Sequence, residues 1–311
     1  MAQALAIRAF DYFTLVQLYQ FNYKGHEDAP GVPIITPENA EEAAANGCAR
    51  STVKETYEFI LGDLNKAIEL LANTKKTRSD KRYVSLDVAY GIRARVHLTM
   101  HNYADALKDA EAALASTSSV PYSSAAVSKP TFIDIEDASW MWGILITDKD
   151  RVSTTGICNF PSHMGSLNYG YASVGGWRRI SPKLYNQIPE SDVRKGWFLD
   201  DTGVSVNLPA AAQAYITKKG APVYTQVKYG PMNDEWGSNN NATDVILMRV
   251  EEMYLIKAEA QAMNNDVSGG VNTLNSFVNT YRDPSYKCTA TTGEACLLYT
   301  SPSPRDMRRS R

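Results

Sequence analysis

The sequence has 311 residues and a mass of 34.4 kDa, with 44% apolar and 21% charged residues. This length suits one large domain or two ordinary ones, with a core that needs no disulfide or metal. No apolar stretch approaches the 18 residues of a membrane-spanning helix, and Lys plus Arg (32) against Asp plus Glu (34) gives a formal charge of −2 without a long basic cluster. A spanning helix is therefore excluded, and the charge argues against nucleic acid as the main partner.

The first predicted element is a helix that begins almost at residue 1. Its periodic residues are Arg8, Phe10, Tyr12, Phe13, Leu15, Val16, Leu18 and Tyr19. The pattern starts without an N-cap residue, and no charged segment followed by an apolar segment and a cleavage site marks a signal peptide. We therefore expect an N-terminally truncated fragment, in which the natural start lies upstream.

The second predicted helix runs from Ser51 to Leu71 and has the clearest periodicity in the chain. Its apolar residues recur every three or four positions: Val53, Tyr57, Ile60, Leu61, Leu64, Ala67, Ile68 and Leu71. Thr52 and Glu55 have the spacing of a capping box, which stabilises a helix start by about 1 kcal/mol.

A polar link over residues 74–83 leads to a predicted helical hairpin from Ser85 to Ala115, with its turn at His101-Asn102. Small residues are spaced as in a tetratricopeptide unit, where two helices cross closely: Ala94, Ala106 and Ala113. A looser copy of this pattern lies at Val250 to Tyr281. Since repeats of this kind stack on neighbours, the long interruption between the two copies is unusual.

The interruption, residues 116–244, has a different composition. It holds all five Trp, eight of the fourteen Pro and many Gly, Ser and Asn. Long helical patterns are absent, and Ser139 to Thr147 is predicted to be a strand or a buried extended run. The predicted organisation is thus a helical scaffold (1–115), an irregular Trp-rich ligand-binding insertion (116–244) and a second, truncated tetratricopeptide-like segment (245–295).

The last residues, 296–311, are expected to be a cloning artefact. Residues 296–306 read CLLYTSPSPRD, which resembles the translation of a transposase-based sequencing adapter, and residues 307–311 fit a variable index followed by more adapter. The alternative is a genuine Pro/Ser/Arg tail. Leaving the segment out removes four Arg and one Asp, so the rest of the chain is mildly acidic.

Motifs for catalysis or metal binding are largely missing. The run Gly170 to Gly175 has one residue too many before Ser173 for a nucleophile elbow, and no P-loop, dinucleotide fingerprint or His-Glu-x-x-His motif occurs. His97 and His101 are four residues apart but lack a third ligand. The carboxylate pairs Asp134/Glu136 and Asp200/Asp201 are interpreted as loop charges. The four Cys (Cys48, Cys158, Cys288, Cys296) lack disulfide or zinc spacing. We expect no catalytic residue, no metal and no cofactor.

Aromatic residues of the insertion give the best binding candidates. Trp140 and Trp142 alternate within an apolar run and are expected in the core. Other rings lie among Gly, Asn and Ser, where they are harder to bury and can serve as stacking platforms. The resulting candidates for ligand binding are Tyr169, Tyr171, Trp177, Trp236 and, as a hydrogen-bond donor, Arg178 next to Arg179, with Tyr23 as a weaker candidate after the first helix.

Several segments, in order from residue 5 to 282, resemble the SusD/RagB family of Bacteroidetes outer-membrane nutrient-binding lipoproteins. They are Arg8-Ala9-Phe10-x-Tyr12, Gly31-Val32-Pro33-Ile34, Arg50-x-Thr52-Val53, Ala94-Arg95-Val96 within its hairpin, Leu184-Tyr185 with Asp192-Val193-Arg194, Lys228-Tyr229, and Met248 to Leu255 leading into Ala258-Glu259-Ala260. Each segment alone is weak, whereas their common order is specific.

The resemblance implies a mainly α fold, a SusD-like helical scaffold with tetratricopeptide-like hairpins and a large irregular insertion of loops and short strands. It further implies a non-enzymatic protein at the cell surface that captures a glycan or peptide and acts as a lid on a SusC-like TonB-dependent transporter. The family's lipid-anchoring cysteine and early helices have no counterpart in this sequence, so attachment to the outer membrane is expected only through an anchor missing from it.

Two alternatives remain open from the sequence. A helical-repeat interaction scaffold would account for the hairpins and would bind a protein without a small ligand. A glycoside hydrolase would account for the aromatic residues and would need two catalytic carboxylates set by spatial position.

Overall fold

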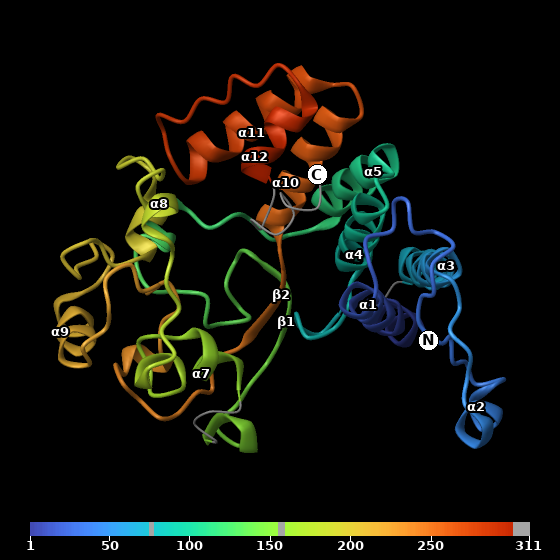
Figure 1. Ribbon diagram of the computed structural model, residues 1–311, viewed down its shortest axis with the longest axis horizontal. Helices are drawn as coiled ribbons and strands as arrows, with labels where there is room; N and C mark the ends of the chain where they lie inside the picture. Colours follow the sequence, from blue (N-terminus) through green and yellow to red (C-terminus); the bar gives the residue numbers. More distant parts are fainter. Residues whose placement is uncertain (75–77, 155–158, 301–311) are drawn as a thin grey trace. The chain divides into compact units, whose positions relative to one another are not determined.

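The computed structural model describes residues 1–74, 78–154 and 159–300. Within these residues the chain is mainly helical, with twelve α-helices and one two-stranded antiparallel sheet (Figure 1). It divides into two compact units. Of the described residues, the first unit contains those of Met1–Ser118, Glu252–Thr273 and 289–300, and the second contains those of Ser119–Glu251 and Leu274–Cys288. No helix in the described part of the chain has the length and apolar character needed to cross a membrane.

Helices α1 (Ala2–Tyr19) and α3 (Val53–Ala72) begin the first unit and confirm the two helices predicted first. Ala6, Ala9, Phe13 and Val16 form the buried stripe of α1, at the spacing of one helix face. Arg8 donates two hydrogen bonds to Asp63 of α3, at 2.7 and 2.8 Å. A short helix, α2 (Ala40–Asn46), lies between them in sequence and has no buried residue, so no apolar periodicity announced it.

The predicted capping box at the start of α3 is present. The Thr52 hydroxyl accepts a hydrogen bond from the Glu55 backbone N–H at 3.1 Å, and the Glu55 carboxylate accepts one from the Thr52 N–H at 2.8 Å. Two of the backbone donors that a helix start leaves unpaired are thereby satisfied. The sequence spacing was sufficient to find this feature because the whole interaction is local.

The predicted hairpin forms helices α4 (Leu86–Thr99) and α5 (Tyr103–Ser116). Ala94, Ala106 and Ala113 are completely buried, as their small size at a close crossing required. Arg93 of α4 holds Asp109 of α5 through two hydrogen bonds of 2.7 and 2.6 Å. His101 adopts a left-handed φ of 61° in the turn, so it does not continue the face of α4 on which His97 lies.

The second tetratricopeptide-like copy forms α10 (Val250–Met263) and α11 (Val267–Tyr281). Within the first unit, α10 lies beside the first hairpin. Arg95 of α4 forms a bidentate ion pair with Glu252 of α10, and Glu111 of α5 pairs with Lys257 at 2.9 Å. The two copies are therefore spatial neighbours despite the long insertion between them, which restores the stacking that such repeats require.

Gly270 of α11 lies where this helix packs closely on α10. A Cβ atom there would come within 2.6 Å of the Ala258 carbonyl oxygen and 2.8 Å of the Ala262 Cβ. Gly270→Ala is therefore expected to lower the free energy of unfolding by about 1–3 kcal/mol through overpacking. The matched control is Gly62→Ala in α3, where a Cβ meets nothing within 4 Å and helix propensity predicts a gain of about 0.5–1 kcal/mol. Urea unfolding of both variants checks this, and equal effects would contradict the close crossing.

The second unit is built around the sheet of β1 (Trp140–Ile144) and β2 (Val245–Arg249), with the register Trp140 to Arg249 and Ile144 to Val245. Trp140 and Trp142 are buried, as expected, but Met141 between them is buried as well. The strand is thus covered on both faces. Two apolar clusters complete this unit: Tyr122, Val127, Phe132, Ile135 and Trp140 form one, and Leu167, Leu199, Ile216 and Val227 form the other.

The insertion contains more helix than its composition indicated. Its short helices are α6 (Ser124–Val127), α7 (Phe160–Met164), α8 (Pro182–Tyr185) and α9 (Ala210–Lys218), with 3₁₀ turns at Arg151–Thr154, Ala172–Val174, Val193–Trp197 and Met232–Asp234. Side-chain caps from Ser123, Asn159 and Ser181 start three of these helices. Such short helices lack enough turns to produce a visible apolar period.

The last described helix is α12 (Gly293–Thr300). Residues 301–311 of the expected artefact tail lie outside the described residues, as does Cys158. Cys48 and Cys288 are free thiols, and Cys296 is buried.

Candidate functional site

The most exposed aromatic pair of the second unit is Tyr169 and Tyr171, with 43% and 49% of their surface accessible. Their neighbours Asn168 and Gly170 are buried. A short segment therefore alternates between residues that hold it to the core and rings that face solvent. Two phenol rings two residues apart offer faces on which a planar or ring-shaped ligand can stack.

The backbone of this segment is fixed on both sides. Gly170 packs so closely on Ser162 that a Cβ would lie 2.6 Å from the Ser162 Cα. The Ser162 hydroxyl accepts a hydrogen bond from the Tyr171 N–H at 2.9 Å, and the Tyr169 N–H donates to the Ser238 carbonyl at 2.8 Å. Rings presented by a rigid backbone lose less entropy when they bind than rings on a free loop. We call Tyr169 and Tyr171 on this backbone the tyrosine platform.

Each ring of the tyrosine platform has a flanking partner. The imidazole of His163 stacks on Tyr171, with ring centroids 5.2 Å apart and planes inclined by 22°. The ammonium of Lys219, just after α9, lies 5.9 Å from the centroid of Tyr169 and 5.7 Å from that of Tyr215. Sequence reasoning missed His163 and Lys219, because only the folded backbone brings them next to these rings.

Trp177 and Trp236, the two tryptophans among the predicted binding residues, are half-buried. Both pack against the apolar cluster of Leu167, Leu199, Ile216 and Val227, so each ring contributes to the core as well as to the surface. The Gly176 N–H next to Trp177 donates to the Tyr171 carbonyl, and the Gly237 N–H next to Trp236 donates to the Leu167 carbonyl. The segments that carry both tryptophans therefore adjoin the platform.

Arg178 and Tyr23 complete the predicted set. Arg178 is exposed, and its guanidinium donates to the Gly176 carbonyl at 3.1 Å. Tyr23 belongs to the first unit, where its ring packs edge-on against Tyr57 at 4.9 Å. Burial raises the pKa of the Tyr23 phenol. The structure thus gathers five of the six candidates in one unit and leaves Tyr23 in the other.

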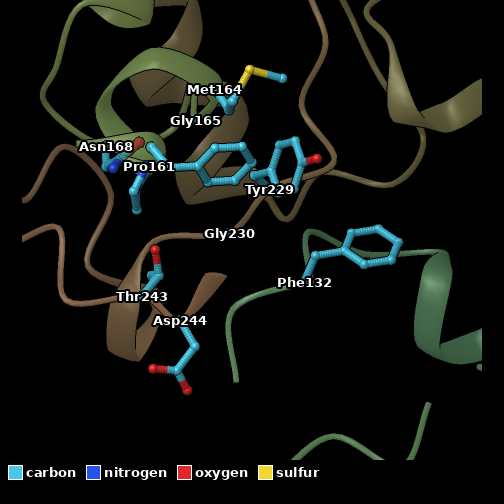
Figure 2. Close-up of a pocket in the computed structure, with 10 residues that line it drawn as sticks. Phe132, Pro161, Met164, Gly165, Asn168, Tyr229, Gly230, Thr243 and Asp244 are labelled. Carbon is cyan, nitrogen blue, oxygen red and sulfur yellow. The ribbon is translucent and has the colours of Figure 1, made fainter. Parts of the chain in front are cut away.

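A small pocket lies beside α7 in the same unit (Figure 2). Its lining includes Phe132, Phe160, Tyr229, Asn168 and Asp244. The volume open to the centre of a water molecule is about 10 Å³, which is room for roughly one water. A saccharide cannot enter it, so the surface platform is the better candidate for ligand binding.

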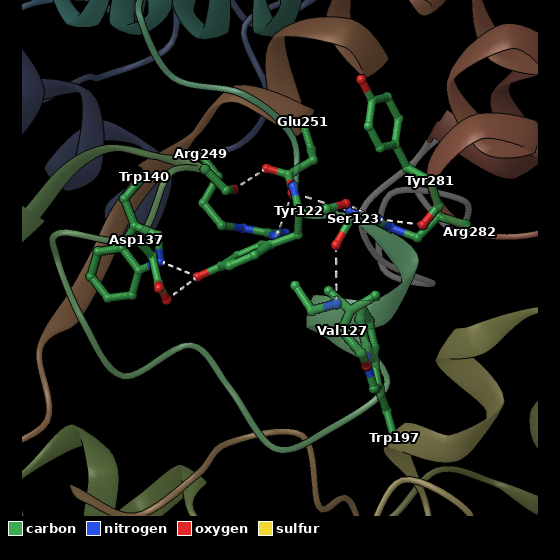
Figure 3. A network of polar contacts seen from close by, with 12 residues as sticks. Tyr122, Ser123, Val127, Asp137, Trp140, Trp197, Arg249, Glu251, Tyr281 and Arg282 are labelled. Atoms are coloured by element: carbon green, nitrogen blue, oxygen red, sulfur yellow. Dashed lines mark hydrogen bonds and ion pairs between the residues drawn. The ribbon is translucent and has the colours of Figure 1, made fainter. Parts of the chain in front are cut away.

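A buried polar network occupies the core of the second unit (Figure 3). Glu251 accepts hydrogen bonds from the Tyr122 N–H at 2.9 Å, from Arg282 at 3.1 Å and from the Ser139 hydroxyl, and Arg249 approaches it at 3.4 Å. Arg282 also donates to the Tyr122 carbonyl at 2.9 Å. Since Glu251 and Arg282 are only 3% and 4% exposed, this carboxylate is interpreted as a structural anchor.

Lys228 lies near this network and has an uncommon environment. Its ammonium lies 4.9–5.8 Å from the ring centroids of Phe132, Trp197 and Tyr229, and it forms no ion pair with a carboxylate in the described part of the chain. Burial, with a smaller contribution from the charge of Arg249, lowers the pKa of Lys228 to about 8. Contacts with the three aromatic rings stabilise the ammonium but do not fully offset the cost of burying its charge.

This pKa shift predicts a pH dependence of stability. The pKa of Lys228 is about 8 in the folded protein and 10.5 ordinarily, so between these values the unfolded chain binds more protons and stability rises with pH. We expect the free energy of unfolding of the wild type to rise relative to that of Lys228→Met as the pH increases from 8 to 10. Chemical denaturation at each pH measures the free energy of unfolding of both proteins. The contributions of the other titrating groups cancel when the two values are subtracted. A constant difference would rule out the shifted pKa.

The remaining residues that the sequence analysis considered for catalysis or metal binding take part in contacts that support the fold. Ser173 is buried, and its hydroxyl accepts a hydrogen bond from the Gly170 N–H at 3.1 Å. Asp200 accepts hydrogen bonds from the backbone N–H groups of Thr202 and Val204, which shape a loop. His97 lies 3.8 Å from Asp109, whereas His101 stacks on Tyr103. No group of three metal-ligating side chains occurs among the described residues.

Known proteins resemble this chain in sequence and in fold. A SusD-like family model, described as "Starch-binding associating with outer membrane", matches residues 1–98. The SusD-like protein P2 of Formosa agariphila is 25% identical over 308 residues, which covers 91% of this chain and 55% of the relative.

Two crystal structures extend the likeness over nearly the whole chain. A SusD-like carbohydrate binding protein from Bacteroides vulgatus matches 99% of it with a TM-score of 0.76 and 25% identity, and a SusD superfamily protein from Bacteroides thetaiotaomicron matches 95% with a TM-score of 0.73 and 21% identity. The chain covers 59% and 62% of these two structures, so it spans roughly three fifths of their length. The predicted mainly α, SusD-like fold is confirmed, and the chain is similar in sequence and in fold to SusD-like proteins.

Proposed function

We propose that this protein captures a glycan nutrient at the bacterial surface without chemical turnover and delivers it to a SusC-like TonB-dependent transporter. The observation that carries the proposal is the tyrosine platform, in which Tyr169 and Tyr171 are exposed on a backbone pinned by Ser162 and Ser238. The family model's description, which includes binding of starch and association with the outer membrane, supports the same reading.

An open platform suits capture and release. A flexible oligosaccharide loses conformational freedom on binding, and two stacked rings with a few hydrogen bonds recover a modest surplus, so dissociation constants between about 1 μM and 1 mM are expected. A ligand held this weakly leaves in time to enter a transporter. The buried, fully engaged state of Glu251 and Ser173, in contrast, leaves neither of them available as a catalytic group.

The test removes both rings. Tyr169→Ala/Tyr171→Ala is expected to weaken glycan binding at least about tenfold, because central aromatic contacts commonly supply 2 kcal/mol or more. A panel of neutral and acidic polysaccharides, together with peptides as the alternative ligand class, can be screened by affinity electrophoresis and measured by calorimetry. Tyr19→Ala, which removes an even more exposed tyrosine (69%) from the first unit, is the control.

Three results would contradict the proposal. Unchanged binding by the double variant would exclude the tyrosine platform. Release of shortened saccharides by the wild type would favour the glycoside hydrolase alternative. Failure to bind any glycan or peptide, together with capture of a protein other than a TonB-dependent transporter, would favour the interaction scaffold. Co-purification with a co-expressed SusC-like transporter is the expected positive result for the partner.

A further inference from the structure

We infer that the ligand of the tyrosine platform is an anionic saccharide, one whose sugar rings carry carboxylate or sulfate groups. This inference rests on the proposed function and specifies its substrate class. Its basis is a set of cations that form no ion pair among the described residues: Lys219, Arg178 and Arg179 beside the platform, and Lys218, which precedes Lys219 in the sequence. We call these four side chains the basic rim.

The cations of the basic rim come from two segments that the fold connects. Arg179 donates from its guanidinium to the Val223 carbonyl at 2.9 Å, and the Gln226 N–H donates to the Arg178 carbonyl at 2.8 Å. Residues 178–179 therefore lie along the chain that follows Lys218 and Lys219. The Gly176–Tyr171 hydrogen bond ties the same arginine segment to the platform.

None of the four forms an ion pair within 4 Å among the described residues. Elsewhere in the same unit the pattern differs, since Arg194 pairs with Asp192 and Lys195 pairs with Glu190. In the described part of the chain, each arginine of the rim donates to one backbone carbonyl, and the Lys219 ammonium lies within 6 Å of the ring centroids of Tyr169 and Tyr215. A carbonyl or a ring stabilises a cation without cancelling its charge.

Lys219 is the cation of the rim that would contact the ligand directly. Its ammonium is 5.9 Å from the centroid of Tyr169, so an anionic substituent on a sugar stacked at this ring comes within reach of a charge-assisted hydrogen bond. Asp234 and Glu235, next to Trp236 in the sequence, are exposed, and Asp200 and Asp201 follow Leu199, which pairs with the Thr225 segment; among the described residues none of these carboxylates forms an ion pair with the rim. A neutral glycan would leave these four charges unused, whereas an acidic one uses them for attraction and for orientation.

The experiment uses saccharides that differ only in charge. Oligogalacturonate and its methyl ester share one backbone with and without carboxylates, and a κ-carrageenan oligosaccharide and its desulfated form provide the sulfate arm. We expect the intact protein to bind at least one charged form about 10- to 100-fold more tightly than its neutral counterpart. Binding of the charged form should weaken steadily as NaCl rises from 20 to 300 mM.

Variants of the basic rim test whether its cations cause the preference for charged saccharides. Lys219→Met and Arg178→Met should each reduce the charged-to-neutral ratio severalfold, and Lys219→Arg should retain it. Lys54→Met is the charge-matched control, because Lys54 is an exposed cation of the first unit near Glu58. Circular dichroism confirms that each variant is folded.

The outcomes separate this inference from the proposed function. Equal, salt-independent binding of charged and neutral forms that still disappears in Tyr169→Ala/Tyr171→Ala would overturn the anionic substrate and keep glycan capture. A charge preference that survives in both Met variants would overturn the role of the basic rim. No binding of any saccharide would overturn the proposed function itself.

Discussion

Glu251→Ala is expected to lower the free energy of unfolding by about 3–5 kcal/mol, because it leaves a buried arginine without its counterion. Arg282 is 4% exposed and donates to the Glu251 carboxylate and the Tyr122 carbonyl. Removal of the carboxylate also deprives the Tyr122 N–H and the Ser139 hydroxyl of their acceptor. Because these donors come from three separate segments, their loss loosens the whole second unit.

Two comparisons make this prediction sharp. Glu251→Gln keeps the shape and one acceptor oxygen but not the charge or the second acceptor oxygen, so it is expected to cost less than Glu251→Ala. Glu190→Ala removes a carboxylate that is 88% exposed and pairs with Lys195, and it should change stability by at most about 1 kcal/mol. Denaturant unfolding of the three variants provides the measurement. Equal stabilities for Glu251→Ala and Glu190→Ala would show that the network does not anchor the unit.

Trp140→Ala is expected to destabilise the protein by about 3–5 kcal/mol through the loss of a fully buried ring. The indole is 0% exposed within the cluster of Tyr122, Val127, Phe132 and Ile135, and its N–H donates to the Tyr122 hydroxyl at 2.7 Å. Gly143 on the same strand leaves room for it, since a Cβ there would lie 3.0 Å from the indole ring.

The control for Trp140→Ala is Tyr171→Ala, which deletes an aromatic ring that is 49% exposed. A surface substitution of this kind is expected to change stability by about 0.5 kcal/mol or less. Thermal unfolding of both variants, followed by tryptophan fluorescence and circular dichroism, distinguishes the core ring from the platform ring. A small effect of Trp140→Ala would mean that the cluster repacks. A large effect of Tyr171→Ala would remove the basis for reading its binding defect as a loss of contact.

The sequence was most informative where an interaction is local. The periodicity from Ser51 to Leu71 and the Thr52/Glu55 capping box predicted α3 with its observed start, because both depend on residues at most four positions apart. The small residues Ala94, Ala106 and Ala113 predicted the close crossing of α4 and α5 for the same reason. Short elements such as α9 escaped prediction, since nine residues give too few helical turns for a clear pattern.

The sequence predicted the candidate site only in part. Composition pointed to Tyr169 and Tyr171, which are exposed, and equally to Trp177 and Trp236, which pack against an apolar cluster. Nothing in a single sequence separates these cases, because burial depends on what other segments place above a ring. The flanking Lys219 is 50 residues from Tyr169 in the chain, and no spacing rule connects them.

The sequence by itself determined the helical class of the chain, the positions of its two tetratricopeptide-like hairpins, the burial of Trp140 and the family resemblance. Tertiary structure alone decided which segments meet: Arg95 with Glu252, Tyr122 with Glu251, and Lys219 with Tyr169. The physical reason is range. Propensity, capping and periodicity act within a few residues, whereas ion pairs, buried networks and binding surfaces depend on distances in space that a chain acquires only when it folds.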